Sequence, residues 1–146
     1  MTAAIWDALQ AVDDAEYPGV SIVDLGLVER VWSGDGRVEI DLVPTFSGCP
    51  ALEMIAADVR AAVSPLADDV DVHFVATPAW TPERITESAR RQLADELCVA
   101  VATPTRPARC PRCGADALIE ESMFGPVRCR SIRRCRACGE AVETIR

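Results

Sequence analysis

The sequence contains no lysine and only one histidine, His73, among its 146 residues. A carboxylate-bridged di-iron oxygenase holds its metals through Glu-x-x-His pairs on helices, and no such pair is present. That class of enzyme is therefore excluded. A single histidine with no second ligand at helical spacing is usually structural, and we interpret His73 in this way. Because every basic residue is an arginine, we interpret the missing lysine as a composition bias without functional content.

The chain also lacks a secretion-signal pattern at its N-terminus and any apolar run of membrane-spanning length. We therefore expect a soluble cytoplasmic protein with no membrane contact. In a chain of this kind, seven cysteines indicate metal binding rather than a set of disulfides. The length suits one domain of ordinary size plus an appendage.

Basic residues are scarce in the first two thirds of the chain. Residues 1–105 hold six arginines against eighteen acids, whereas residues 106–146 hold nine arginines against five acids. The acidic body has no excess of cations to replace phosphate counterions, and the basic tail has few aromatic side chains on which bases could stack. We therefore expect no nucleic-acid partner. Arg112, Arg134 and Arg136 are interpreted as balancing the negative charge of a thiolate metal site.

The clearest motif consists of two Cys-x-x-Cys pairs, formed by Cys110 with Cys113 and by Cys135 with Cys138. A glycine follows each pair and allows a tight turn, so that backbone N–H groups can point at the sulfurs. Four thiolates suit a tetrahedral zinc ion. Residues 110–146 contain too few large apolar side chains to fold without the cross-link that such an ion provides. We predict a structural zinc, in preference to the rubredoxin-like iron that the same ligands would allow.

The first hundred residues show helical and strand patterns in the order helix, strand, strand, helix, strand, helix. Residues 33–36 (SGDG) predict a tight hairpin, and the alternation of apolar and charged residues over 37–43 predicts its return strand. We expect Thr2 to cap the first helix and Thr81 to cap the last. The predicted fold class is α/β (α+β), with helices on a small mixed sheet, followed by a zinc ribbon. The predicted boundaries are a domain over 1–102, a proline-rich linker over 103–109 and the ribbon over 110–146.

The loop between the second strand and the second helix contains Cys49. Pro50 is expected at the first helical position, which places Cys49 on the helix cap. Unpaired backbone N–H groups and the helix dipole favour a thiolate there. Such a thiol is either a nucleophile or soft-metal ligand, or a small buried residue that fills the turn. Loops at strand ends usually carry the chemistry of such sheets, and the side chains there are Asp24, Thr45, Ser47 and Cys49.

Two of these assignments have alternatives. Asp24 either caps a turn before Gly26 or belongs to a site. Cys129, a further cysteine of the tail, is a buried filler, an extra metal ligand or a partner for Cys49, and the sequence does not decide between them. The sequence also leaves open whether the chain forms a homodimer.

Three stretches closely resemble the iron–sulfur assembly domain of SufT-type proteins: residues 14–18 (DAEYP), 21–28 (SIVDLGLV) and 44–50 (PTFSGCP). Residues 77–81 (TPAWT) and the tail from Phe124 to Cys135 extend the similarity. The whole chain resembles the D-subunit family of the ring-1,2-phenylacetyl-CoA epoxidase system, which serves phenylacetate degradation.

The resemblance implies an accessory protein without catalytic activity of its own. Its partners would be the oxygenase and reductase subunits of the epoxidase complex, in which it would help to install or repair an iron–sulfur or di-iron centre. Cys49 would be the transient ligand to iron or an iron–sulfur cluster, with Asp24, Thr45 and Ser47 shaping its pocket. Two alternatives remain at this point: a zinc-ribbon adaptor that docks the oxygenase and reductase, and a rubredoxin-like electron carrier.

Overall fold

The computed structural model describes residues 1–45, 50–126 and 130–145. The chain forms two compact units, Met1–Trp80 and Thr81–Arg146. In the part of the chain that the structure describes, no helix is both long and apolar enough to cross a bilayer.

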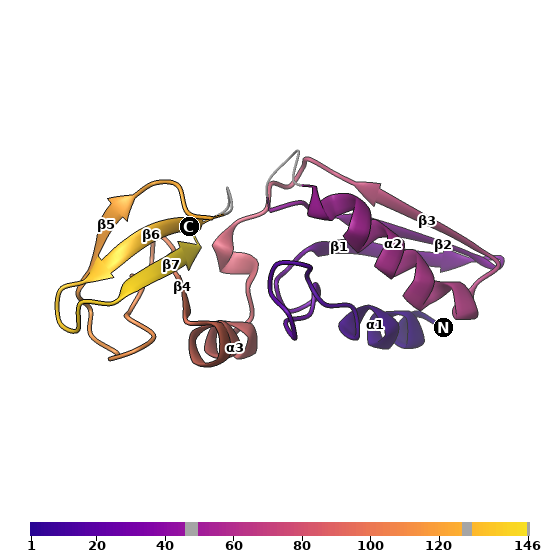
Figure 1. Ribbon diagram of the computed structural model, residues 1–146. Coiled ribbons are helices and arrows are strands. Elements are labelled where there is room, and N and C mark those ends of the chain that lie inside the picture. The colour runs from indigo at the N-terminus through magenta and orange to yellow at the C-terminus, as the bar shows by residue number, and fades with distance from the viewer. Residues whose placement is uncertain (46–49, 127–129, 146) are drawn as a thin grey trace. The chain divides into compact units, whose positions relative to one another are not determined.

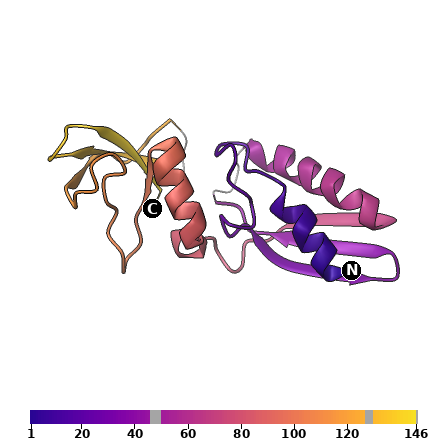
Figure 2. The ribbon, with the colours of Figure 1, turned by 90° about the horizontal axis from the view of Figure 1, so that it is seen from below.

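The first unit is a three-stranded mixed sheet with two helices. Strand β1 (Val28–Gly34) is antiparallel to β2 (Arg37–Leu42), and β2 is parallel to the edge strand β3 (Asp69–Phe74). Helices α1 (Thr2–Gln10) and α2 (Ala51–Val63) lie on one face of this sheet (Figures 1 and 2), and a 3-10 turn, η1 (Ser64–Leu66), leads from α2 into β3. The predicted order of elements and the mixed sheet are both confirmed.

The predicted hairpin is also confirmed. Asp35 and Gly36 form its two-residue loop with φ values of 52° and 76°, which suits the turn type whose twist matches the flanking strands. On β2, Val38, Ile40 and Leu42 are buried, whereas the residues between them are not. This period of two places the apolar face of the strand in the core.

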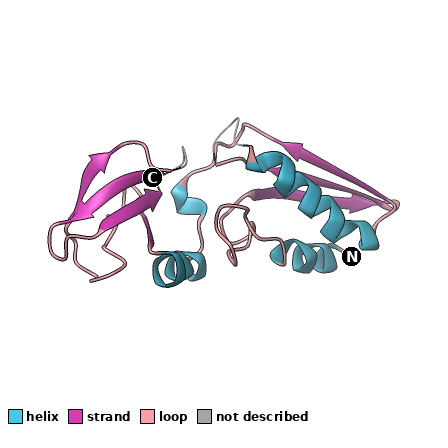
Figure 3. Ribbon diagram, in the orientation of Figure 1, coloured by secondary structure: helices cyan, strands magenta, loops and turns pink. Residues whose placement is uncertain are grey.

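The second unit contains a short 3-10 turn, one α-helix and a four-stranded sheet among its described residues (Figure 3). The elements are η2 (Pro82–Arg84), α3 (Glu87–Leu97), β4 (Val99–Val101), β5 (Leu118–Ser122), β6 (Arg130–Cys135) and β7 (Ala141–Ile145). The strand order is β4-β7-β6-β5, with β4 parallel to β7 and the other pairs antiparallel. Strand β4 therefore completes the ribbon's sheet.

This pairing moves the boundary between the two units. The sequence predicts a division at 103–109, whereas the structure divides the chain between Trp80 and Thr81. The reason is that β4 forms a parallel ladder with β7, in which Ala100 is paired with Thr144, so the helix and strand before the proline-rich segment belong to the ribbon unit.

Two predicted helix caps are wrong. Thr2 lies inside α1, with Met1 at the cap position, and its hydroxyl is 3.3 Å from that of Ser33. Thr81 precedes only the short turn η2. Helix α3 begins at Glu87, directly after Thr86. The hydroxyl of Thr86 accepts a hydrogen bond from the backbone N–H of Ala89 (3.2 Å), which is the bond that defines a cap.

Candidate functional site

The four paired cysteines come together in the second unit. Cys110 and Cys113 precede β5, Cys135 ends β6, and Cys138 lies in the turn into β7. Their four Sγ atoms all lie within 4.8 Å of one another, with Cys110 3.7 Å from Cys138 and Cys113 3.6 Å from Cys135. A tetrahedron with metal–sulfur bonds of about 2.3 Å has sulfur–sulfur edges of about 3.8 Å, whereas a disulfide bond is about 2.0 Å long. The arrangement therefore fits four ligands of one tetrahedral metal ion.

Both Cys-x-x-Cys turns are built in the same way. The N–H of Gly114 donates to the carbonyl of Cys110, and the N–H of Gly139 donates to that of Cys135, each over 2.8 Å. The two glycines have φ values of 76° and 80°, a region of the backbone map that favours glycine. These turns fold the chain around the sulfurs, as the spacing predicts.

Backbone N–H groups also point at the sulfurs and change their acidity. The N–H of Cys138 hydrogen-bonds to the sulfur of Cys135 and, together with that of Ala137 and the neighbouring thiols, lowers the pKa of Cys135 to about 7 against the effect of burial. The N–H of Glu140 lowers the pKa of Cys138, but burial and the neighbouring thiols raise it to about 12. Protons must therefore leave this cluster when a metal ion binds.

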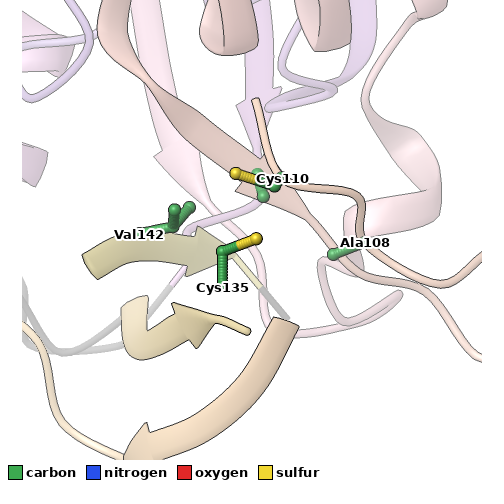
Figure 4. Packing of buried hydrophobic residues seen from close by; sticks show 5 residues of the cluster. Ala108, Cys110, Cys135 and Val142 are labelled. Atoms are coloured by element: carbon green, nitrogen blue, oxygen red, sulfur yellow. The ribbon is translucent and has the colours of Figure 1, made fainter. Parts of the chain in front are cut away.

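The sulfurs lie beside a very small apolar core. Cys110 and Cys135 are buried next to Ala108, Val142 and Ala100 (Figure 4), whereas Cys113 and Cys138 are exposed. This cluster buries little apolar surface by itself, and Leu93, Val99 and Ile145 are buried elsewhere in the same unit. A metal ion at this position would add stabilisation where the apolar packing is sparse.

Two of the three arginines assigned to charge balance have carboxylate partners. Arg112 Nε lies 3.5 Å from Glu140, and Arg134 Nε lies 3.0 Å from Glu121. Arg134 also donates to the carbonyl of Gly139 (2.9 Å), which ties β6 to the second cysteine turn. Their positive charge is therefore shared with nearby acids.

A second candidate site is a hollow in the first unit. Strands β2 and β3 are parallel and in register, with Leu42 paired to Phe74, so their carboxyl ends meet at one edge of the sheet, where Ala51 begins α2. The hollow at this edge is lined by apolar side chains, by Thr45 and by the acids Asp14 and Glu16. In sequence, residues 46–49 follow Thr45, which lines the hollow, and precede Pro50.

The predicted site residues divide into three groups. Thr45 lines the hollow. Ser47, Cys49 and Cys129 lie outside the described residues. Asp24 is not among the residues that line the hollow, and its Oδ2 accepts a hydrogen bond from the side chain of Gln10 (2.9 Å).

The start of α2 differs from the prediction by one residue. The helix begins at Ala51, and Pro50 occupies the cap position with φ −60° and ψ −23°. Pro50 already has helical backbone angles, so Cys49 precedes the cap instead of occupying it. Cys49 is still adjacent in sequence to the first turn, where backbone N–H groups have no partner within the helix.

The turn around Asp24 is closed by other groups. The hydroxyl of Ser21 accepts from the N–H of Val23 (3.1 Å), and Gly26 has a φ of 76°. Trp80 donates its indole N–H to the carbonyl of Leu25 (2.8 Å). Asp24 therefore links this turn to α1 through Gln10 and does not cap the turn.

Comparisons with known proteins follow the two-part organisation of the chain. Residues 2–74 match the family described as iron-sulfur cluster assembly protein, and residues 95–146 match the PaaD zinc beta ribbon domain. A protein of Escherichia coli, named as a candidate D component of 1,2-phenylacetyl-CoA epoxidase, is 36% identical over 146 residues. The match covers 93% of this chain and 87% of that protein. The chain belongs to the PaaD-like family.

Other relatives cover a smaller share of this PaaD-like chain. The Fe-S protein maturation auxiliary factor YitW of Bacillus subtilis is 38% identical over 89 residues, which are 59% of this chain and 86% of YitW. The crystal structure of a DUF59 domain from Bacillus anthracis has a TM-score of 0.59 and 34% identity, and covers 62% of this chain and 89% of that one. For the Thermotoga maritima protein TM0487 the TM-score is 0.55 and the identity 30%, with coverages of 64% and 93%.

Two polar residues that line the hollow, Asp14 and Glu16, are not among the site residues predicted from the sequence. The carboxylate of Asp14 accepts a hydrogen bond from the backbone N–H of Glu16 (2.8 Å), and Asp14 is 7% exposed. By local pattern, residues 13–19 indicate only a polar loop. The signal for both acids was the DAEYP stretch, one of those on which the PaaD-like resemblance rests.

Proposed function

We propose that this PaaD-like chain is an accessory protein, without catalytic activity of its own, that assembles or repairs a metal centre in a multicomponent phenylacetyl-CoA epoxidase. The names of the Escherichia coli and Bacillus subtilis relatives support the client complex and the maturation role, respectively. The partners are the oxygenase and reductase subunits of that complex, in the cytoplasm. The observation that carries the proposal is the hollow lined by Thr45 and Ala51, which stand close in sequence to residues 46–49. It lies in the iron–sulfur assembly unit and is separate from the four-cysteine cluster.

The four-cysteine cluster is proposed to hold a structural zinc ion. Its sulfur–sulfur distances of 3.6 and 3.7 Å match the edges of a zinc–thiolate tetrahedron. Four protein ligands leave no open position on the ion, which is typical of structural sites. In this proposal Cys110, Cys113, Cys135 and Cys138 bind zinc and keep the ribbon folded.

Cys49 is proposed as the thiolate that holds the iron or iron–sulfur cargo during transfer. Thr45, Asp14 and Glu16 line the hollow, and hydroxyl and carboxylate groups are oxygen ligands or hydrogen-bond partners suited to iron and its bound water. The apolar side chains Leu52 and Phe74 line the same hollow and would limit the access of water. Ser47 belongs to the same loop in sequence, whereas Asp24 accepts a hydrogen bond from Gln10 and does not line the hollow.

The test is the activity of the epoxidase in cells that carry Cys49→Ala. The matched control is Cys98→Ala, because Cys98 is an exposed thiol outside the four-cysteine cluster. We expect Cys49→Ala to lower epoxidase activity at an unchanged level of folded protein, and Cys98→Ala to leave it unchanged. Full activity with Cys49→Ala would refute the role of this thiol.

A non-catalytic adaptor is the second candidate function, and one observation favours it. Ile119, Met123 and Phe124 are 45%, 56% and 73% exposed, on and just after the edge strand β5. Apolar side chains gathered at an exposed sheet edge often mark a protein contact. If docking is the whole function, Phe124→Ser abolishes co-purification with the oxygenase and reductase, and Cys49→Ala has no effect on activity.

A further inference from the structure

The second unit contains a groove of about 470 Å³ that neither the zinc cluster nor the cargo site uses. Helix α3 and residues 105–109 line it together with the short strand β4. Four arginines line the groove: Arg90, Arg91, Arg106 and Arg109. Val99 and Val101 of β4 contribute an apolar portion of the lining. Volumes of this order are typical of sites for small molecules.

Among the described residues, a carboxylate partner is found for one of the four arginines. Arg106 makes a bidentate contact with Glu87, at 2.6 and 3.1 Å. Arg90 donates to the carbonyl of Pro82 (3.2 Å) and Arg109 to that of Gly114 (3.4 Å).

No carboxylate in the described part of the chain lies within 4.0 Å of the guanidinium groups of Arg90, Arg91 or Arg109. Asp95 and Asp116 line the groove without forming such a pair. Among the described residues, the charges of these three guanidinium groups are therefore not neutralised by a carboxylate in direct contact.

The pKa of Arg90 also indicates an excess of positive charge around this residue. Burial lowers the pKa of Arg90, and so does the positive charge of Arg106. Together these two effects outweigh Glu87 and Glu83, which raise the pKa. A half-buried cation is thus held beside another cation. An anion bound between them would relieve this repulsion.

We propose that the groove binds a small phosphorylated molecule, with its phosphate on Arg90, Arg91 and Arg109 and an apolar portion against Val99 and Val101. Guanidinium groups match the geometry of phosphate oxygens and form charge-assisted pairs with them. A phosphate monoester carries close to two negative charges at neutral pH, which suits three unpaired cations beside two acids. The proposal does not depend on the cargo role of Cys49.

The experiment is calorimetric titration of the full, zinc-loaded chain with phenyl phosphate and with inorganic phosphate. Phenyl phosphate carries both the charge and the apolar portion, so we expect it to bind more tightly than inorganic phosphate. The double variant Arg91→Gln/Arg109→Gln should weaken the binding of phenyl phosphate by about tenfold or more, because two charge-assisted contacts are lost. The matched control is Arg60→Gln, which removes one exposed arginine from α2 of the first unit. Unchanged zinc content and circular dichroism establish that each variant is folded.

Several results would overturn the proposal. Affinity of the double variant within about twofold of the parent would show that these arginines are not the site. Because Arg60→Gln removes one charge and the double variant removes two, a loss of binding free energy in Arg60→Gln half as large as that of the double variant would show binding by net charge alone. Tighter binding of hexaglutamate than of phenyl phosphate would identify an acidic protein segment as the ligand, and binding only to vesicles that contain phosphatidic acid would identify a membrane lipid.

Discussion

The Sγ atoms of Cys113 and Cys135 lie 3.6 Å apart, although the two residues are 22 positions apart in sequence. The strand β5 and its pairing with β6 lie between them and close this loop. The distance is that of two ligands of one metal ion and is too long for a disulfide bond. A metal ion bound there would cross-link the two ends of this loop.

Removal of zinc should unfold the second unit and leave the first unit folded. Hydrogen exchange followed by mass spectrometry, before and after treatment with a chelator, reports on the folding of each unit independently. Amides of residues 81–145 should lose protection, because the apolar core beside the cysteines is small and the metal would hold the cysteine turns together. Amides of β2 should remain protected, since Ile40 and its neighbours belong to a separate core. Returning zinc is the control and should restore protection; a ribbon that stays protected without metal would contradict this account.

The affinity for zinc should increase with pH. The zinc-bound state holds fewer protons than the metal-free state, so raising the pH favours binding. The pKa of Cys135 is about 7, and below that pH this thiol also becomes protonated. The loss of affinity should therefore become steeper on the acidic side of about pH 7. Competition with a chelator of known pH dependence measures the slope, and an affinity that does not change with pH would contradict thiolate ligation.

The two threonines before α3 should differ in their effect on stability. Thr86→Ala removes the hydroxyl that accepts from the N–H of Ala89, and should lower the free energy of unfolding of the second unit by about 1 kcal/mol. Thr81→Ala is the matched control, because Thr81 makes no capping bond and should change stability by less than about 0.5 kcal/mol. Denaturant unfolding of the zinc-loaded protein provides both values. Equal effects of the two substitutions would mean that the cap is misassigned.

The metal in the ribbon should be zinc, at one ion per chain. Elemental analysis and the absorption spectrum of the purified protein decide this, because a four-cysteine iron site is red and redox-active whereas zinc is colourless. Cys135→Ser should abolish the bound zinc, since the loss of one of four ligands opens the site. Cys98→Ser is the control and should retain it. A red protein with stoichiometric iron would support electron transfer as the function instead.

Local patterns predicted the parts of the fold that depend on neighbouring residues. The hairpin at Asp35 and Gly36 follows from turn chemistry, and the burial of Ile40 follows from alternation along one strand. The cysteine turns follow from a spacing of two residues and a glycine. In each case the residues that determine the structure lie within a few positions of one another.

Features that depend on distant pairings could not be predicted in this way. Strand β4 has only three residues and acquires its partner β7 from more than forty positions away, which moved the boundary between the units. The hollow likewise brings Asp14 to the edge of the sheet where β2 and β3 end, and nothing in the local sequence around Asp14 indicates that position. Both cases concern tertiary packing, which overrides the local signal.

The most direct test of the maturation role is the iron and sulfide content of the oxygenase and reductase subunits, purified anaerobically from cells that carry the parent chain, Cys49→Ala or Cys98→Ala. The account predicts that Cys49→Ala leaves these subunits depleted of iron or sulfide by about tenfold, as loss of a metal-handling ligand would, while Cys98→Ala leaves them fully loaded. Full loading of both subunits with Cys49→Ala would contradict the account.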